Sequence, residues 1–386
     1  MGVFSEYLEK LHDFPAIEGE RKKQLNRIAK LRGRAILTIA GDIAKTGAPT
    51  GIDYADRLPV ADQLESLTGS SIDVILETPG GYAERAEDIV KQIRDKFDDV
   101  AFIVPGAAMS AGTIMVMSGD EILLEPGSSL GPIDAQVMFG GKRFSAEAFL
   151  QGLEKIKKEV EESSILNKTY IPILQGISVA EIQACENAQD FSKKLVSNWL
   201  ATCKFKNWDK HSSTGNPVTE DEKMQRAEDI AGQLCNHSHW LTHGRSIKLK
   251  DLNEMRLKVT DYTEDADLCD AIRRYYTLLR MGFDMTSMYK LFETPTTQIY
   301  RFASPPVALP AGRPGSADVA QIDLPCPRCK NGIRIQANMG KKQPLQEGSV
   351  PFPADNKLRC SNCGLEIDLG GIRKQLEAQN KKQVVT

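Results

Sequence analysis

The sequence predicts an α/β fold, in which helices cover a parallel sheet, followed by a small domain held together by a metal ion. Two observations support the main part of this prediction: short apolar runs alternate with segments of helical period, and a long charge-rich helical stretch follows them. Parallel strands need a crossover connection, usually a helix, so this alternation is typical of a parallel sheet. A third observation, two Cys-x-x-Cys motifs after residue 320, accounts for the small domain.

The predicted strands are short runs rich in Ile, Val and Leu, at 35–40, 72–76, 100–104 and 121–124. Apolar residues recur at helical spacing between and after them, at 57–67, 83–97 and 110–119. Further helices are expected at 7–32, 144–205, 247–257 and 266–291. The run Val100–Gly119 is uncharged and long enough to span a bilayer, but Pro105-Gly106 and Gly112 interrupt it. We therefore expect a strand, a turn and a helix there.

Composition indicates where the domains end. The segment Ala303–Ala317 holds four prolines and two glycines, so it cannot continue a helix and predicts an interdomain linker. The expected parts are an N-terminal helical segment (1–32), a main domain (33–300) with a helical insertion at about 144–235, the linker (301–320), a zinc-binding domain (321–372) and a polar tail (373–386).

Overall composition and charge are those of an ordinary soluble protein. Hydrophobic residues make up 41% and charged residues 26%, and the net charge is -3, which excludes a disordered chain and a polyanion binder driven by bulk charge. The first twenty residues lack the apolar core of a secretory signal.

Four other cysteines have no spacing that indicates disulfide bonds, as is usual in proteins of reducing compartments. They are Cys185, Cys203, Cys235 and Cys269. We expect a cytoplasmic protein with no membrane attachment.

Two glycine-containing turns after buried strands carry candidate chemistry. In Thr78-Pro79-Gly80-Gly81 the paired glycines can present N–H groups to an anion, although such a sequence also serves as a plain turn. The other turn places Ser110 directly before an apolar helix. That serine is either the N-cap of the helix or a nucleophile whose developing oxyanion is held by the Ala111 N–H. The second interpretation predicts acyl transfer.

Four ordered blocks carry a family resemblance: Thr78–Gly81, Ala108–Thr113, Asp120–Ile122 and Gly131–Asp134. With Lys194–Leu200 and Leu241-Thr242-His243, they resemble the serine dehydrogenase proteinase family, a distant branch of the Clp-protease and crotonase superfamily. The resemblance covers roughly residues 20–260. No Gly-x-Gly-x-x-Gly motif follows a strand, so the sequence does not indicate a dinucleotide-binding dehydrogenase.

The resemblance implies a Clp/crotonase-like stack of ββα units and a serine endopeptidase that acts on a protein or peptide substrate. Carried over by matching motifs, Ser110 is the nucleophile, Asp134 the acid and His243 the base. The N–H groups of Gly80, Gly81 and Ala111 then form the oxyanion hole. Clp-fold relatives pack their helical regions against neighbouring subunits, so the resemblance also implies a homo-oligomer.

The identity of the acid and the base stays open in the sequence. Asp134 lies in a Gly-Pro-x-Asp turn, where an aspartate can simply bind the local backbone. His237 and His239 compete with His243, and the spacing of the three also occurs in metal sites. In the family, an aspartate or similar residue and a proline soon follow the histidine, whereas 244–246 here read Gly-Arg-Ser.

Two rival functions belong to other classes. The first is a peptidase with a Ser-Lys dyad, for which Lys142 is the nearest candidate lysine. The second is a non-catalytic scaffold, in which the same fold assembles a ring and the C-terminal domain recruits a partner.

The C-terminal cysteines predict a zinc ribbon. Cys326-Pro327-Arg328-Cys329 and Cys360-Ser361-Asn362-Cys363 are separated by 30 residues, and Lys330-Asn331-Gly332 and Gly364 after them permit tight turns. Four thiolates at this spacing make a closed tetrahedral site for structural Zn²⁺. The alternative is two unrelated pairs of reduced cysteines. However, a domain this small without a large apolar core needs a metal ion or a similar cross-link to be stable.

The predicted zinc ribbon is the basic part of an acidic chain. Residues 324–386 contain eleven Lys and Arg against five Asp and Glu, a formal charge of +6 that falls to about +4 with four thiolates and a zinc ion. Base stacking requires aromatic platforms, and Phe352 is the only aromatic residue in this range. We therefore expect the ribbon to recruit a protein partner or substrate, with nucleic acid as the alternative.

Overall fold

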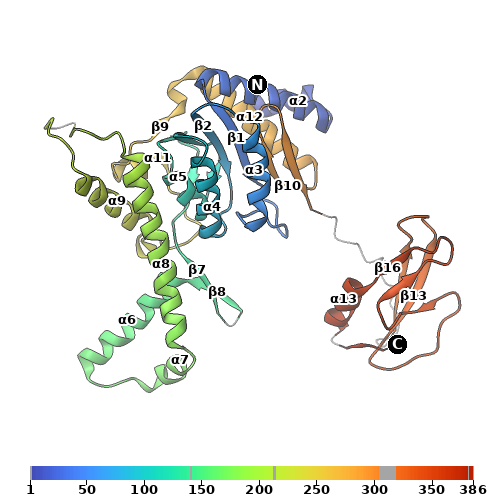
Figure 1. The fold of residues 1–386 in the computed structure, drawn as a ribbon. Coiled ribbons are helices and arrows are strands. Elements are labelled where there is room, and N and C mark those ends of the chain that lie inside the picture. Colours follow the sequence, from blue (N-terminus) through green and yellow to red (C-terminus); the bar gives the residue numbers. More distant parts are fainter. Residues whose placement is uncertain (1, 140, 212–213, 304–318, 381, 386) are drawn as a thin grey trace. The chain divides into compact units, whose positions relative to one another are not determined.

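The computed structural model describes residues 2–139, 141–211, 214–303, 319–380 and 382–385. Its contacts divide the chain into two compact units, Met1–Ala303 and Ser304–Thr386. The first unit contains a seven-stranded sheet and most of the helices, and the second is a small β domain (Figure 1). Most of the proline-rich segment predicted as a linker lies outside the described residues.

The large sheet has the strand order β11-β10-β1-β2-β3-β5-β9. Its strands are β1 (Ala35–Gly41), β2 (Ser71–Glu77), β3 (Asp99–Val104), β5 (Glu121–Leu124), β9 (Thr260–Asp261), β10 (Met288–Glu293) and β11 (Gln298–Phe302). The five strands from β1 to β9 in this order are parallel, and β10 and β11 add an antiparallel edge. The predicted α/β fold with a parallel sheet is confirmed.

Helices cover both faces of this sheet. On one face lie α2 (Phe14–Arg32) and α12 (Ala266–Met285), and on the other lie α3 (Arg57–Glu65), α4 (Ala83–Arg94) and α5 (Ala111–Met117). Successive residues of a strand point to opposite faces, so Ile36 of β1 packs with α2 and α12 while Leu37 packs with α3 and α4. Burial of both faces explains why the parallel strands are almost continuously apolar.

The helix predicted over 266–291 ends earlier than expected. α12 stops at Met285, where the Thr286 hydroxyl bonds back to the Gly282 carbonyl, and the next apolar residues form β10 beside β1. A short apolar run cannot be assigned to helix or strand from its periodicity alone, so the sequence did not reveal this strand.

The charge-rich insertion is helical, as predicted, but it is broken into pieces. It consists of α6 (Ala146–Ser163), α7 (Ile171–Gln175), α8 (Val179–Trp199), a π-helical turn (Leu200–Lys204) and α9 (Glu220–Leu234). Together α6, α7 and the first half of α8 form an arm that extends away from the sheet (Figure 1). Short elements complete the unit: α1 (Val3–Lys10), β4 (Ala107–Ala108), β6 (Ser129–Leu130), β7 (Gln136–Phe139), β8 (Lys142–Ser145), α10 (His237–Trp240) and α11 (Leu249–Glu254).

The second unit is built around a hairpin of two strands, and two short strands pair with the free edge of its second strand. Its elements are β12 (Val319–Pro325), β13 (Gly332–Met339), β14 (Val350–Pro351), β15 (Lys357–Arg359), β16 (Glu366–Asp368), α13 (Gly370–Asn380) and β17 (Val384–Val385). The polar tail expected at 373–386 is therefore partly ordered: α13 buries Leu376, and Val384 of β17 packs in the same core while β17 pairs with β13. The sequence did not predict this helix and strand, because their apolar residues stand singly among charged and polar ones.

None of the helices in the described ranges combines the length and the apolar character needed to cross a bilayer.

Candidate functional site

Ser110 lies at the start of α5 in an unusual backbone conformation. Its φ is 51° and its ψ is -112°, a strained combination for a residue with a side chain. The residue occupies the N-cap position, yet its side chain makes no capping hydrogen bond, and the hydroxyl has no partner among the described residues. The N-cap role considered from the sequence is therefore not the one this side chain fills, and the hydroxyl stays available.

The glycines of the Thr78–Gly81 turn lie against this serine. A Cβ atom placed on Gly80 would lie 2.9 Å from the Cβ of Ser110 and 3.6 Å from the Ala111 nitrogen. Both Gly80 (φ 109°) and Gly81 (φ 144°) adopt positive φ, and a Cβ on Gly81 would lie 2.2 Å from the Ile52 carbonyl oxygen. Only glycine fits at either position, so backbone atoms approach Ser110 directly.

The three candidate oxyanion donors are not equivalent. Ala111 is the first residue of α5, so its N–H has no acceptor inside the helix. The Gly80 N–H already donates to the Thr78 hydroxyl oxygen at 3.2 Å. Gly81 and Ala111 are therefore better placed than Gly80 to receive a new anion.

Thr113 holds the segments around Ser110 together. Its hydroxyl lies 2.8 Å from the carbonyl oxygens of both Ala108 and Gly131, and it accepts the Gly131 N–H at 3.0 Å. The side chain is fully buried. A single threonine thus fixes the strand before Ser110 to the segment that leads to Asp134.

Asp134 is buried and receives hydrogen bonds from side chains rather than from its own turn. Ser145 Oγ donates to it at 2.6 Å, Gln136 Nε2 at 2.9 Å, and His237 Nδ1 lies 3.0 Å away. His243 Nδ1 lies 3.7 Å from the same oxygen, Oδ2. Burial raises the pKa of Asp134, but contacts with His243 and Ser145 and the charge of His237 outweigh it, so the pKa lies below its ordinary value. The carboxyl group therefore stays ionised.

Two of the three candidate histidines share this carboxylate. His237 begins α10, and its backbone N–H donates to a Glu147 carboxylate oxygen at 2.8 Å. His243 lies in the following turn, and its Nδ1 is buried without a hydrogen-bond partner in the described structure. His239 packs its ring against Trp240, with ring centroids 4.5 Å apart, and makes no contact with Asp134.

Ser110 and Asp134 line one cavity of about 960 Å³. Its other walls come from the glycine turn, from β7 and from α8; they include Gly81, Tyr82, Gln136, Met138, Asn187 and Phe191. Lys142 is exposed at the start of β8 and does not line this cavity. The arrangement presents a free hydroxyl and backbone N–H groups in a hollow large enough for several peptide residues.

Glu77 is a buried carboxylic acid directly before the glycine turn. It accepts the Ala107 N–H at 2.9 Å and the Tyr276 hydroxyl at 3.2 Å. Burial raises its pKa to about 7 despite these hydrogen bonds. No sequence motif named above contains this residue, although an acid at the end of the apolar run Ile72–Leu76 was a visible signal.

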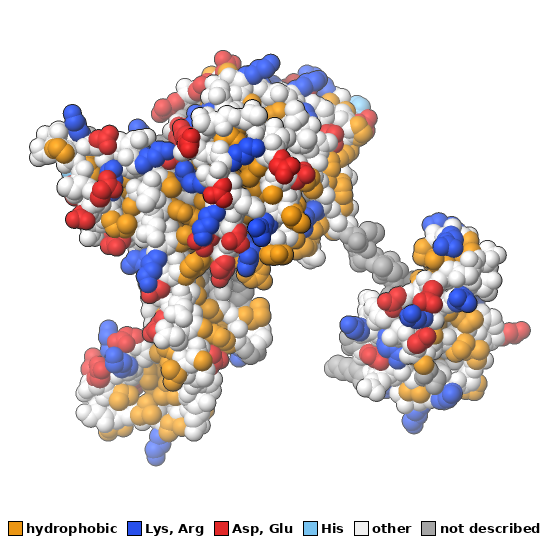
Figure 2. All heavy atoms as spheres, in the orientation of Figure 1, with side chains coloured by type: hydrophobic (Ala, Val, Ile, Leu, Met, Phe, Trp, Pro, Cys, Tyr) orange, Lys and Arg blue, Asp and Glu red, His pale blue; other side chains and the backbone are white. Residues whose placement is uncertain are grey.

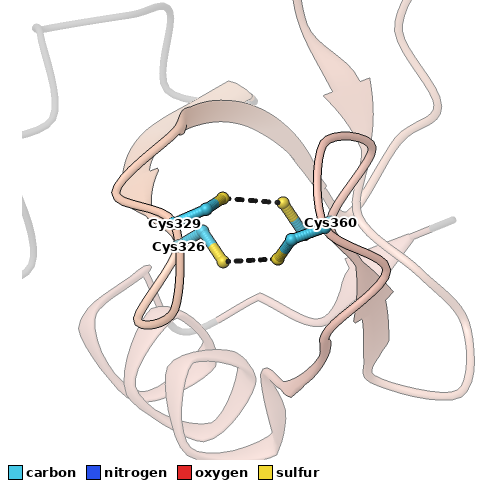
Figure 3. A group of neighbouring side chains, drawn as sticks. Cys326, Cys329 and Cys360 are labelled. Carbon is cyan, nitrogen blue, oxygen red and sulfur yellow. Dashed lines mark hydrogen bonds between the residues drawn. The ribbon is translucent and has the colours of Figure 1, made fainter.

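In the second unit the four predicted zinc ligands converge. Sγ of Cys326 lies 3.6 Å from that of Cys363, and Sγ of Cys329 lies 3.7 Å from that of Cys360 (Figure 3). All four sulfur atoms lie within 4.8 Å of one another. A tetrahedral Zn²⁺ site with Zn–S bonds of about 2.3 Å has edges of roughly 3.8 Å, so the cluster has the right size for this ion.

The two Cys-x-x-Cys turns have the same local structure. Lys330 and Gly364, each immediately after the second cysteine of its pair, adopt left-handed conformations with φ of 61° and 70°. Their N–H groups donate to the carbonyl oxygens of Cys326 and Cys360, each at 2.9 Å. Matching turns of this kind fit four thiolates that bind one metal ion, not two separate reduced pairs.

Comparison with known proteins bears on the first unit. Residues 65–222 match the family model described as "ClpP-like SDH-type serine proteinase". This segment is ClpP-like. The match confirms the family resemblance, and it contains Ser110 and Asp134, whereas His237 and His243 lie beyond it.

Two curated relatives are uncharacterized proteins of Methanocaldococcus jannaschii. MJ1495 is 28% identical over 129 residues, which are 33% of this chain and 44% of that protein. MJ0137 is 24% identical over 222 residues, 54% of this chain and 73% of that protein. The chain thus spans less than half the length of the first of these relatives.

Two solved structures are also similar to this chain. ClpP1 from Listeria monocytogenes is 12% identical, with 60% of this chain and 89% of that chain covered at a TM-score of 0.31. A mutant of the membrane-bound stomatin-specific protease 1510-N is 15% identical, with 55% of this chain and 77% of that chain covered at a TM-score of 0.31.

Proposed function

We propose that the protein is a serine peptidase in which Ser110 is the nucleophile. The observation that carries this proposal is the strained backbone of Ser110, which holds a hydroxyl without a partner in the described structure in the same cavity as the ionised Asp134. Strain of this kind persists where the surrounding structure enforces it, and it concentrates at functional residues. The match of residues 65–222 to a serine proteinase family supports the same conclusion.

In the proposed mechanism, a histidine removes the proton from the Ser110 hydroxyl as its oxygen attacks the substrate carbonyl carbon. Asp134 fixes the orientation of that histidine and stabilises its charged form. The N–H groups of Gly81 and Ala111, with Gly80 as a third candidate, stabilise the negative charge on the substrate oxygen. The histidine then protonates the leaving amine, and water releases the acyl group by the same steps.

Labelling of the full chain with a fluorophosphonate, followed by peptide mapping, tests this proposal. A serine hydroxyl reacts with such a probe only if a base and oxyanion donors activate it. A single label on Ser110 would support the peptidase. A folded protein that never reacts would favour the non-catalytic scaffold instead.

The base is either His237 or His243, and paired substitutions should distinguish them. We expect His243→Gln to suppress labelling of Ser110 by about a thousandfold and His237→Gln to weaken it by less than about tenfold. The expectation for His243 comes from the family resemblance, which places the base in Leu241-Thr242-His243. His237 is the rival, because its Nδ1 lies 3.0 Å from Asp134, the contact that the base of a triad also makes.

The matched control is His239→Gln, which changes a histidine of the same segment that does not contact Asp134. This variant should label at the rate of the unmodified protein. If His237→Gln abolishes labelling and His243→Gln does not, His237 is the base and the assignment of His243 is wrong.

We propose that the arm mediates a homo-oligomer. The helix α6 has eighteen residues but buries only Ala146, and α7 buries none. Large apolar side chains are exposed along the arm, among them Ile165, Ile173 and Val179, and Figure 2 shows hydrophobic side chains gathered there. A second copy of the arm would cover this apolar surface.

Light scattering on the full chain should therefore give a mass several times that of one chain. We expect the double variant Ile173→Asp/Val179→Asp to be monomeric, because two charges in an apolar contact destabilise it strongly. The control is Leu58→Asp, which changes an equally exposed residue of α3 outside the arm and should leave the mass unchanged. A monodisperse monomer of the unmodified protein would refute this proposal.

The zinc ribbon is proposed to recruit a protein partner or substrate. Phe352 is 2% exposed and packs in the core of the second unit, with the Arg373 guanidinium 5.1 Å from its ring centre. A buried ring cannot stack on a nucleic-acid base. This observation favours a protein over the nucleic acid that the sequence left as the alternative.

A further inference from the structure

A second cavity of about 930 Å³ lies elsewhere in the first unit. Its walls come from β5, the π-helical turn, the segment after that turn, α9, and the segment that joins α11 to β9. It shares no lining residue with the Ser110 cavity. Nothing in the proposed peptidase mechanism uses it.

The charged side chains that line this cavity are mostly cationic. They are Lys204, Lys210, Arg226, Arg256 and Lys258 against Asp120 and Glu121, five positive and two negative groups, a formal charge of +3. In a concave site, charges of one sign focus the electrostatic field on a bound ligand.

The two acids are already neutralised by cations that do not line the cavity. Asp120 pairs with Arg94 at 3.1 Å and with Lys206 at 2.7 Å, and Glu121 pairs with Arg32 at 2.6 Å. The acids therefore do not offset the positive charge of the cavity walls.

Several of the lining cations, by contrast, have no side-chain partner in the described parts of the chain. No described residue forms an ion pair or a side-chain hydrogen bond with Lys210, Arg256 or Lys258. Lys204 is partly buried, and its Nζ donates only to the Asp120 carbonyl oxygen, at 3.3 Å. Burial lowers the pKa of Lys204 to about 8; the charge of Glu121 opposes this shift, and the nearby Lys258 adds to it. A bound anion would offset the cost of burying this ammonium group beside a second cation.

Two of these cations lie at backbone irregularities. Lys204 is the last residue of the π-helical turn, and Arg256 adopts a positive φ of 56° directly after α11. Both kinds of irregularity are uncommon, and both occur preferentially at functional sites.

We propose that this cavity binds a small molecule that carries two or more negative charges on phosphate or carboxylate groups. Lysine and arginine donate charge-assisted hydrogen bonds to the oxygens of either group.

Isothermal titration calorimetry on the full chain tests the proposal, with sodium tripolyphosphate and sodium citrate as separate ligands. We expect saturable binding of at least one of them at one site per chain. The double variant Arg256→Asn/Lys258→Gln should weaken that Kd at least tenfold. Asparagine is chosen because it tolerates positive φ, so the backbone at 256 is kept.

The matched control is Lys168→Gln/Lys250→Gln, which removes two positive charges from exposed positions outside the cavity. It should leave the Kd within twofold of the unmodified protein. Tighter binding of tripolyphosphate would identify the ligand class as phosphate, and tighter binding of citrate as carboxylate. If neither anion binds saturably, or if the control weakens binding as much as the cavity variant, the proposal is wrong.

Discussion

Replacing Ser110 with alanine should reduce peptide hydrolysis by the full chain by about three orders of magnitude or more. The substitution removes one oxygen atom that has no hydrogen-bond partner in the described structure. Alanine at φ 51° is as strained as serine, so the cost of the backbone conformation does not change. We therefore expect the thermal stability to stay the same while the activity is lost. Initial rates with a fluorogenic peptide and melting temperatures measure the two effects separately.

Ser192 provides a matched control for this experiment. It lines the same cavity, but its hydroxyl donates to the Ala188 carbonyl oxygen of α8 at 3.2 Å and is not free to attack a substrate. Ser192→Ala should keep both hydrolysis and fluorophosphonate labelling. Hydrolysis that persists in Ser110→Ala would remove Ser110 as the nucleophile.

Replacing Cys360 with serine should remove zinc from the protein and unfold the second unit. Structural Zn²⁺ contributes about 10–16 kcal/mol of binding free energy in zinc-finger peptides, far more than a core of this size supplies. That core contains only about a dozen buried apolar side chains, and two of them are the ligands Cys326 and Cys360 themselves. Elemental analysis should give about one zinc per chain before the substitution and none after it.

The first unit should be unaffected, because it has its own core and its own sheet. Calorimetry should therefore lose one transition and keep the other. Cys203→Ala, a change at a buried cysteine outside the cluster, is the control and should retain the zinc. Native protein that contains no metal would contradict the prediction.

The sequence predicted best those parts of the structure that depend on residues close together in the chain. Apolar runs and helical spacing predicted β1, β2, β3 and β5 to within two residues, because burial on both faces leaves a continuous apolar signal. The Cys-x-x-Cys spacing predicted a cluster that the structure brings together, because each pair forms its turn locally.

The surroundings of Asp134 were not predictable in the same way. Ser145 both donates to Asp134 and accepts the Ala148 N–H as the N-cap of α6, and only the second role leaves a sequence signal. The contact of His237 with Asp134 joins residues 103 positions apart, and no spacing rule connects them. Three histidines were candidates for the base in the sequence. In the structure, His237 and His243 lie within 4 Å of this carboxylate.

The position of β10 has a consequence for how the chain acquires its structure during synthesis. β1 pairs on one side with β2, which follows within 40 residues, and on the other side with β10, which begins at residue 288. Until the ribosome has released about three-quarters of the chain, one edge of β1 has no strand paired with it. The sheet face that α12 covers in the complete fold is exposed until the same stage. Such edges and faces attract other unfinished chains. A fragment limited to residues 65–222 would lack β1, β10 and α12, so the shortest piece that can complete the sheet runs from the N-terminal helices to residue 302.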